Sequence, residues 1–419
     1  MKISVSYFKK ILFEHKVILV NFSFLSITQF FTLLLPLITY PYLIRTLGKD
    51  TYGLYAFANS SVTYFTIIIN FGFNLSASKD IAQNIKNKEK LSEIVSSVYI
   101  IKIILLILSF SIYLILLLTV SKLNSHFLFH LLTFSFCIGD LLIPTWFFQG
   151  IEKMKYTTYV HIISRLFFTL MIFFVVHSYA DVLWLPILNF LGILFSGIYC
   201  SYLVFYKYNI SFKIERFNIV FSYFKASFPF FLSRVSSIFN TESNTVLIGF
   251  FLTMKDVANY DLAKRIIDMA LIPFGMLNNA IYPKMAREKN ISFIKKILKI
   301  VVFSSIIFAL LISLFSKYII LILGGAAMLD SQILLYLLSF SLPMYAISYF
   351  LGNTVLVVLG KSVEFNKSVI YQTIIFTTIT IFAILLNIWG VYQASLIISI
   401  SSIFMVIYRY FYIKKYKLL

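Results

Sequence analysis

The chain has 419 residues and a formal net charge of +20, yet only 12% of its residues are charged and 60% are hydrophobic. A soluble domain carries roughly 25% charged residues, so the composition excludes a soluble globular protein. Uninterrupted apolar runs of about twenty residues, the length of a helix that crosses ~30 Å of hydrocarbon, exclude the alternating strands of a membrane barrel. We therefore predict an all-α polytopic membrane protein.

The N-terminal stretch is basic and then apolar, which is typical of a signal peptide. The apolar residues continue to about Ile44, however, and show no small-residue cleavage site. We therefore predict that this stretch is retained as the first of about twelve membrane helices. The predicted helices cover residues 17–44, 52–73, 95–119, 127–148, 157–178, 182–205, 227–251, 257–282, 297–323, 331–358, 368–388 and 390–411.

Lysine and arginine residues are distributed unequally between the predicted loops. With the N-terminus in the cytoplasm, 26 of the 36 face the cytoplasm, five face the other side and five lie within helices. The positive-inside rule therefore predicts that both termini are cytoplasmic. The net charge of +20 then faces anionic lipid headgroups, and it does not indicate a nucleic-acid partner.

The two halves of the chain resemble each other at one place. GKDTYGLYAFA, residues 48–58, aligns with TMKDVANYDLA, residues 253–263, at a constant offset, so that Tyr55 meets Tyr260. Six helices per half return the chain to the same orientation, which indicates a parallel repeat about a pseudo-two-fold axis, an arrangement of transporters. We predict two lobes, residues 1–212 and 213–419. Part of the charged linker, residues 206–226, is predicted to lie as an amphipathic helix on the inner face.

Polar residues are concentrated in four of the predicted helices, residues 17–44, 52–73, 227–251 and 257–282. Unsatisfied polar groups in hydrocarbon cost several kcal/mol each, so we expect these helices to line a hydrated cavity between the lobes. The nearly pure apolar helices should face lipid. The alternative for the hydroxyl groups is hydrogen bonding between packed helices.

Three stretches of the first half resemble a known family: RTLGKDTYGLYAFANSSVTYF, NFGFNLSASKDIA and PTWFFQGIEKMKY. They are similar to the O-antigen flippases of the Wzx family, in the multidrug/oligosaccharidyl-lipid/polysaccharide exporter superfamily that also holds the MATE exporters. In the second half the resemblance is looser and rests on DVANYDLAKR and PKMAR. The family's basic position after the second helix falls on Lys79, a lysine that keeps the charge but loses the bidentate geometry of arginine.

The resemblance implies a flippase that moves undecaprenyl-pyrophosphate-linked oligosaccharide repeat units from the cytoplasmic to the periplasmic leaflet of the bacterial inner membrane. It implies alternating access between two six-helix lobes and coupling to a proton or sodium gradient, without a bound cofactor. The implied partners are this lipid, membrane lipids and other membrane proteins of polysaccharide assembly. Lys79 would then lie at the cytoplasmic gate.

Charged residues within the predicted helices are candidate functional residues, because a charge near the bilayer centre costs at least ~2.5–3.5 kcal/mol. Arg165 and Asp140 lie about eight residues from the same end of consecutive helices. They form either a structural pair or a site in which Arg165 binds the lipid pyrophosphate and Asp140 tunes it; His161, one turn from Arg165, could join either arrangement. Lys102 lies near a helix end, where it can snorkel to the headgroups.

The second half carries six such charges on two helices. Arg234 suits the capture of phosphate or acidic sugar, because guanidinium groups bind phosphate oxygens bidentately, and Glu242 is a candidate proton or cation site. The alternative for both is an intrahelical network. The remaining four recur at helical spacing and are predicted to form one stripe of paired charges on a cavity wall. We expect Lys264 and Arg265 to bind substrate and Asp261 and Asp268 to pair with them or to couple ions.

Two other function classes remain open. A MATE-like drug or cation exporter would share the fold, but the mixed embedded charges fit an anionic headgroup better than a cationic drug. A membrane polysaccharide polymerase or ligase would need a large periplasmic loop, and no predicted loop is long. The two cysteines, Cys137 and Cys200, lie in apolar stretches and are predicted to be ordinary buried residues, without a disulfide or a metal site.

The predicted orientation can be tested by labelling single cysteines from either side of the membrane. A cysteine at Asn84 should react only from the cytoplasm, and a cysteine at Gly325 only from the periplasm, because the lysine-rich loops stay inside. The reverse pattern would show that the orientation is wrong.

Overall fold

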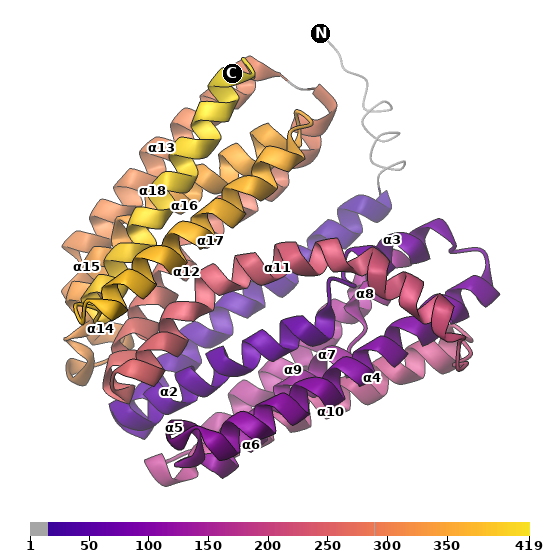
Figure 1. Ribbon diagram of the computed structural model, residues 1–419, viewed down its shortest axis with the longest axis horizontal. Helices are drawn as coiled ribbons and strands as arrows, with labels where there is room; N and C mark the ends of the chain where they lie inside the picture. The colour runs from indigo at the N-terminus through magenta and orange to yellow at the C-terminus, as the bar shows by residue number, and fades with distance from the viewer. Residues whose placement is uncertain (1–15, 289) are drawn as a thin grey trace. The chain divides into compact units, whose positions relative to one another are not determined.

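The computed structural model describes the backbone of residues 16–288 and 290–419 and most of their side chains, and this described part is helical without a β-strand (Figure 1). The prediction of an all-α membrane protein is therefore confirmed. The basic residues before Lys16 and Lys289, both counted in predicting the orientation, lie outside the described residues.

Nine helical segments of the described chain are long and apolar enough to cross a membrane. One of them lies within α2 (Lys16–Asn70), which contains two predicted helices, because Gly48 alone leaves the helical conformation, with φ 75°. The charged helices α11 (Phe217–Phe251) and α12 (Met254–Glu288) are long enough to span but are not among the nine. With these two and with both halves of α2, the described chain has the predicted number of about twelve.

The described chain forms two compact units. Of the described residues, unit 1 contains 16–39 and Val62–Arg234, and unit 2 contains Tyr40–Ser61 and those from Val235 to Leu419. The bounds differ from those of the predicted lobes, residues 1–212 and 213–419, because the middle of α2 packs with unit 2 and the start of α11 with unit 1. The repeat of two six-helix lobes stays a prediction.

Unit 1 is built around α10, which packs against α9 and α7, while α3 packs against α8 (Figure 1). Besides its parts of α2 and α11, the unit contains α3 (Ser76–Gln83), α4 (Lys88–Thr119), α5 (Ser121–Asn124), α6 (Phe127–Thr133), α7 (Phe136–Leu142), α8 (Thr145–Gly150), α9 (Met154–Val175), the 3-10 turn η1 (Tyr179–Leu183), α10 (Trp184–Tyr202) and the π-helical turn η2 (Leu203–Lys207).

Unit 2 is built around α18, which packs against α17, α16 and α15, while α12 packs against α15 (Figure 1). Besides its parts of α2 and α11, the unit contains α12, α13 (Ile291–Leu314), α14 (Ser316–Leu323), the 3-10 turn η3 (Ala326–Met328), α15 (Ser331–Ser339), α16 (Ser341–Tyr349), the π-helical segment η4 (Phe350–Val357), α17 (Ser362–Leu385) and α18 (Val391–Lys415).

The predicted helix 127–148 is broken into α6, α7 and α8. Pro144 explains the second break, because proline has no N–H to donate to the carbonyl oxygen four residues earlier, and it disfavours helical geometry in the preceding residue. Ile143 is accordingly extended, with φ −107° and ψ 90°. The carbonyl group that loses its helical donor belongs to Asp140, and this break therefore prepares a polar site inside a membrane segment.

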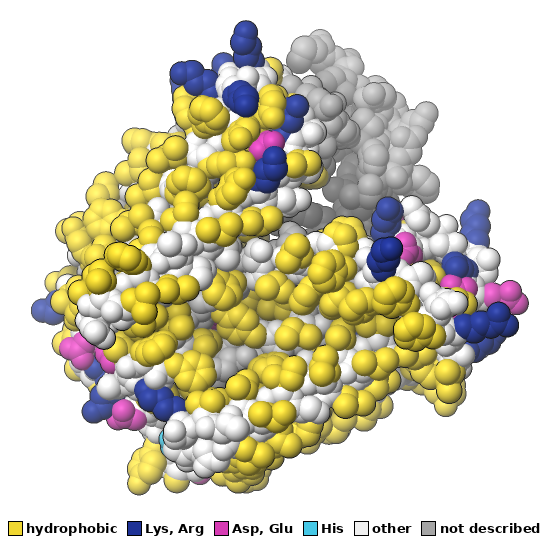
Figure 2. All heavy atoms as spheres, in the orientation of Figure 1, with side chains coloured by type: hydrophobic (Ala, Val, Ile, Leu, Met, Phe, Trp, Pro, Cys, Tyr) yellow, Lys and Arg dark blue, Asp and Glu magenta, His cyan; other side chains and the backbone are white. Residues whose placement is uncertain are grey.

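Apolar side chains cover the outer faces of the helices, and Lys and Arg side chains gather where helices end (Figure 2). On α4 and α13, side chains such as Ile104, Ile107, Phe303 and Leu310 are more than half exposed. Large exposed apolar faces are rare on soluble proteins but are expected where helices contact lipid. The faces of these two helices agree with the prediction that they face lipid.

Two features differ from the sequence-based predictions. The linker forms no separate amphipathic helix: its backbone at Ser211 and Lys213 bonds to the hydroxyl groups of Ser92 and Ser96 of α4, and its last part begins α11. Arg409, counted among the cytoplasmic cations, is buried; its Nε donates to Ser368 at 2.8 Å, and its Nη1 donates to the carbonyl oxygen of Ser348, next to the wide turns of η4. The linker contacts give partners to backbone N–H groups that lie outside a helix.

A close helix contact in unit 2 depends on Gly53. A Cβ atom at this position would lie 1.9 Å from the carbonyl oxygen of Met254, whereas one at Gly275 would meet nothing within 4 Å. We predict that Gly53→Ala lowers the free energy of unfolding by ~1–3 kcal/mol through overpacking. The matched control Gly275→Ala should be neutral or stabilising by up to ~1 kcal/mol. Apparent melting temperatures of the purified variants in detergent measure both; equal values would contradict the contact.

Candidate functional site

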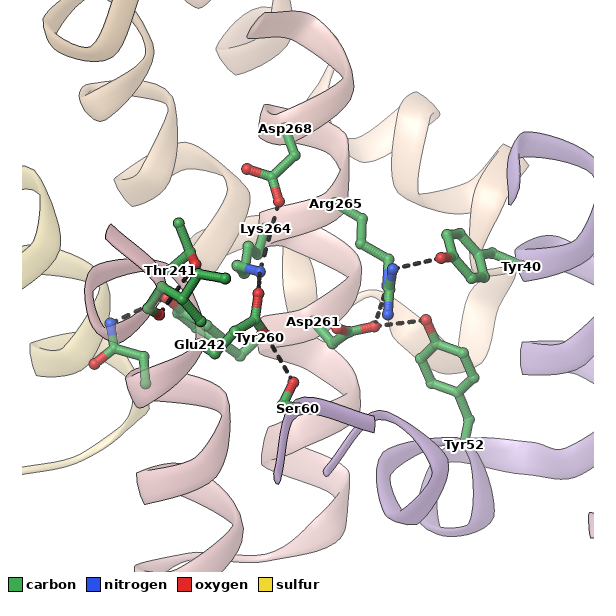
Figure 3. Close-up of polar contacts among 12 residues, drawn as sticks. Tyr40, Tyr52, Ser60, Thr241, Glu242, Tyr260, Asp261, Lys264, Arg265 and Asp268 are labelled. Carbon is green, nitrogen blue, oxygen red and sulfur yellow. Dashed lines mark hydrogen bonds and ion pairs between the residues drawn. The ribbon is translucent and has the colours of Figure 1, made fainter. Parts of the chain in front are cut away.

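A charged cluster in unit 2 surrounds Lys264 (Figure 3). The Lys264 ammonium lies 3.1 Å from Oε1 of Glu242 on α11 and 3.6 Å from Oδ2 of Asp268, one turn further along α12. The second oxygen of Glu242 accepts a hydrogen bond of 2.9 Å from the Ser60 hydroxyl group. One cation is therefore shared by two carboxylates from two helices.

A second set of contacts in unit 2 surrounds the buried carboxylate of Asp261 (Figure 3). Its Oδ2 accepts hydrogen bonds from the Tyr52 hydroxyl group at 2.7 Å and from Nε of Arg265 at 2.6 Å. Arg265 also donates from Nη1 to the Tyr40 hydroxyl group, and its guanidinium carbon lies 4.2 Å from the centre of the Tyr40 ring. These contacts join α12 to the middle of α2.

The four charges predicted to lie within the membrane part of α12 thus form two pairs with different neighbours. Asp261 pairs with Arg265, and Lys264 pairs with Asp268, each at a spacing of four residues. Because a helix turns ~100° per residue, the adjacent residues Lys264 and Arg265 point about 100° from each other, and Figure 3 shows them leaving α12 on different sides. These pairs agree with the predicted pairing, but only Lys264 and Asp268 border the cavity of this unit, so the four charges do not line one cavity wall together.

Lys264 and Asp268 line a cavity of about 130 Å³ within unit 2, whereas Asp261 and Arg265 do not. Its other polar lining comes from Asn240 and Thr241 of α11, Tyr260 of α12, and Ser341 and Tyr345 of α16. The arrangement can accept one small polar or charged group next to the Lys264 ammonium.

Unit 1 holds a separate charged site at the Pro144 break. The Lys102 ammonium donates to Oδ2 of Asp140 at 2.7 Å and to the carbonyl oxygen of the same residue at 2.8 Å, which is the carbonyl group that Pro144 leaves without a helical donor. Oδ1 of Asp140 accepts a hydrogen bond of 2.9 Å from Asn70. The Lys102 side chain is 1% exposed. The expectation that it snorkels is therefore wrong, because a carboxylate and a free carbonyl group bind it inside.

Asp140 and Arg165 line one cavity of about 320 Å³ within unit 1, together with His161. The sequence-based expectation that these three meet at one depth therefore agrees with the structure, but the ion pair of Asp140 is made with Lys102. Two lysine or arginine cations, Lys102 and Arg165, stand against one carboxylate here. The remaining lining residues are Thr66, Phe136, Gly139, Ile143, Thr145, Ser164, Phe168, Asn189 and Ile193.

The other two predicted site residues are exposed. Arg234 lies on α11 in unit 1, five residues after Pro229, and Lys79 lies on the short helix α3. Beside Lys79, partial burial raises the pKa of the Asp80 carboxyl group above its usual range, and the neighbouring lysines oppose this rise. The proposed tasks of Arg234 in substrate binding and of Lys79 at a gate stay predictions.

Sequence reasoning missed Tyr40, Tyr52, Ser60 and Asn70, the uncharged partners that α2 supplies to the charged residues. A hydroxyl or amide group in a membrane helix has many uses, so the sequence carried no specific signal for them. Lys102 did carry one, since it stands alone in an otherwise apolar run.

Neither cysteine takes part in these sites, and both are buried, as predicted. Within the part of the chain that the structure describes, no group of three or more His, Cys, Asp or Glu side chains is arranged to hold a metal ion. The polar residues that line the two cavities carry ammonium, guanidinium, carboxylate, hydroxyl, amide and imidazole groups.

Comparison with known proteins identifies a family that the chain matches. The family model described as "Polysaccharide biosynthesis protein" matches residues 18–289. The chain is 28% identical over 360 residues to an Escherichia coli (strain K12) protein named "Putative O-antigen transporter", covering 84% of this chain and 86% of that one.

Two solved structures share the fold. A multidrug resistance MATE family transporter in an inward-facing conformation superposes with a TM-score of 0.69 at 16% identity, over 91% of this chain and 95% of that one. The lipid II flippase MurJ, in an inward closed conformation, gives a TM-score of 0.68 at 19% identity, over 93% and 87%. These likenesses confirm the MATE-like fold that the sequence predicts.

The Lys102–Asp140 pair yields a stability prediction. In Lys102→Met the Asp140 carboxylate and its carbonyl group lose their cation inside the protein, and removing one partner of a buried pair costs ~3–5 kcal/mol. Because Asp140 is 26% exposed, we expect a loss at or below the lower end. The double variant Lys102→Met/Asp140→Asn should regain part of the melting temperature in detergent. A double variant no more stable than the single one would show that the charge pair is not the cause.

Proposed function

The chain belongs to the polysaccharide biosynthesis protein family, and from this membership we propose that it is a transporter that flips lipid-linked oligosaccharides across a bacterial membrane. The observation that carries the proposal is the family match over residues 18–289, together with a relative named as an O-antigen transporter over 84% of the chain. The fold shared with MATE transporters and MurJ supports transport rather than an enzymatic reaction.

The substrate that we propose is an undecaprenyl-pyrophosphate-linked repeat unit of O-antigen or a related surface polysaccharide. Its headgroup is anionic at the phosphates and polar at the sugars, and each part needs partners when it leaves water. Arg165 in the unit 1 cavity and Lys264 in the unit 2 cavity are cations that can bind phosphate oxygens. The larger cavity, about 320 Å³, is in the range of small-ligand pockets, which begin near ~300 Å³.

The same proposal includes the direction of transport and its energy source. The positive-inside distribution supports cytoplasmic termini, and the family implies movement from the cytoplasmic to the periplasmic leaflet by alternating access. Asp268, which lines the unit 2 cavity, and Glu242, which pairs with the same lysine, are candidates for coupling this movement to a proton or sodium gradient, because a carboxylate can bind either ion.

A cation exporter is the competing function, since the chain shares the MATE fold. The charges of unit 1 favour the anionic substrate. Arg165 lines the cavity of this unit, and Asp140, the carboxylate of the same lining, is already paired with Lys102, so a cationic drug would have to compete with Lys102 for it. Arg234 adds a further exposed cation to the same unit.

The proposal predicts which cations transport requires. In a strain that lacks its own flippase, the wild-type gene should restore surface polysaccharide, whereas Arg165→Ala and Arg234→Ala should reduce it at least ~10-fold at normal protein level. The reason is that a hydrogen bond to a charged group contributes ~1.5–3 kcal/mol. Arg216→Ala, which removes an exposed cation of the linker, is the matched control and should restore wild-type amounts. Wild-type amounts in the first two variants would refute their binding role, and failure of the wild-type gene would refute the function.

A further inference from the structure

The formal charges of the unit 2 cluster do not sum to zero. Asp261 and Arg265 form one closed pair, to which Tyr52 and Tyr40 supply further hydrogen bonds. The other three charges are Lys264, Glu242 and Asp268, so that two carboxylates share one ammonium. One negative charge of the cluster therefore lacks a cation of its own, which raises the question of what compensates it.

The two carboxylates do not hold Lys264 equally. Glu242 lies 3.1 Å from the ammonium, is 20% exposed, and is fixed by the Ser60 hydroxyl group at 2.9 Å. Asp268 lies 3.6 Å from the ammonium and is 56% exposed. The longer distance and the greater exposure make Asp268 the weaker partner, and it is the carboxylate that can leave Lys264 without leaving a buried group unpaired.

The space beside this weak pair is suited to one small anion. The cavity of about 130 Å³ is well below the ~300 Å³ of typical small-molecule pockets, so it takes one group of a molecule rather than the whole. Lys264, Tyr260 and Tyr345 line it, and the Tyr260 hydroxyl group, which accepts a hydrogen bond of 3.0 Å from the Asn244 amide, keeps its own proton to donate. An ammonium and hydroxyl groups in one small cavity form a donor set for phosphate oxygens.

We propose that a phosphate group of the substrate replaces Asp268 at Lys264, and that Asp268 takes up one proton from water as the phosphate binds. This inference rests on the proposed function, because it names the phosphate of a lipid-linked substrate as the ligand. The exchange leaves Lys264 paired with phosphate and with Glu242, and it turns the Asp268 carboxylate into a neutral carboxylic acid.

Charge repulsion is the physical reason for the coupling. A phosphate at Lys264 adds negative charge beside a cluster that already has an excess, and a like charge nearby favours the protonated form of a carboxyl group. By linkage the effect is reciprocal: protonation of Asp268 strengthens phosphate binding by the same factor by which phosphate strengthens protonation. Substrate and proton therefore bind to this state together.

Among the described residues, the other titratable groups near Asp268 are less able to take up this proton. The titratable groups nearby are the tyrosines Tyr260 of α12 and Tyr345 of α16, the carboxylate Glu242 of α11, which Ser60 holds, and Asp261, which Arg265 and Tyr52 hold. Tyrosines are protonated at neutral pH, and α15 and α18 contribute the apolar Leu338 and Ile398 to the cavity.

The test is isothermal titration calorimetry of the full chain in detergent with farnesyl diphosphate, at one pH in two buffers of different ionisation enthalpy. The difference between the buffers gives the protons taken up per bound ligand. Wild type and Asp268→Asn bind the same ligand, so comparing them removes proton exchange by the phosphates themselves. We expect net uptake by wild type, at least half of it lost in D268N, and binding by D268N at least as tight as by wild type.

Variants of Lys264 test the phosphate partner. Lys264→Gln should weaken binding at least ~10-fold, as expected for a lost charged hydrogen bond, and Lys264→Arg, which keeps the charge, should recover part of it. The control Lys255→Gln removes an exposed cation at the start of α12 and should bind like wild type. Inorganic pyrophosphate serves as a second probe. If Lys264→Gln weakens binding of both probes, Lys264 recognises the phosphates themselves. If it weakens binding of farnesyl diphosphate alone, Lys264 recognises only the lipid-linked form.

Two outcomes would overturn the inference. The first is that wild type and K264Q bind the ligand equally well, or that neither binds it. The second is that wild type and D268N take up equal numbers of protons. Neither outcome contradicts the proposed function if the wild-type gene still restores surface polysaccharide. If that gene fails to restore polysaccharide while proton-linked binding is intact, the exchange at Lys264 stands and the proposed flippase function is refuted.

Discussion

A lysine or arginine side chain in hydrocarbon is so unfavourable, by at least ~2.5–3.5 kcal/mol on insertion scales, that each embedded cation must find an anion or a backbone carbonyl group inside the protein. Lys102 finds both in Asp140, Lys264 lies between two carboxylates, and Arg265 pairs with Asp261. These pairings decide where α4, α7, α11 and α12 lie within their units. They also decide which charges are free to act on a ligand.

Helix breaks supply part of these partners. Pro144 removes a helical hydrogen bond inside a membrane segment, and the carbonyl group so released belongs to the residue whose carboxylate binds Lys102. In unit 2 the wide turns of η4 lie beside the buried Arg409, which donates to a carbonyl group of the preceding helix α16. In unit 1 the helix break and the buried cation therefore satisfy each other, because Lys102 donates to the carbonyl group that Pro144 leaves without a helical donor.

The two cations of the unit 2 cluster differ in their contacts. Arg265 contacts the carboxylate of Asp261 and the ring and hydroxyl group of Tyr40, and it joins α12 to the middle of α2, so that its contacts stabilise the packing of these helices. Lys264 has a weaker second carboxylate and borders a cavity, so that its contacts can be exchanged. A transporter for an anionic lipid needs both kinds, because its structure must hold while its binding groups change partners.

The sequence by itself determined the class, the approximate helices, the family and the list of embedded charges, because hydrophobic length, charge counts and contiguous motifs are properties of the chain. It also determined that Asp261 and Arg265, four residues apart, can pair. Only the tertiary structure decided that Asp140 pairs with Lys102, that Ser60 and Tyr52 of α2 complete the charged sites of unit 2, and that Lys264 faces a cavity while Arg265 does not. The physical reason is that these partners lie far apart in the chain, and the direction of a side chain around its helix has meaning only once the neighbouring helices are in place.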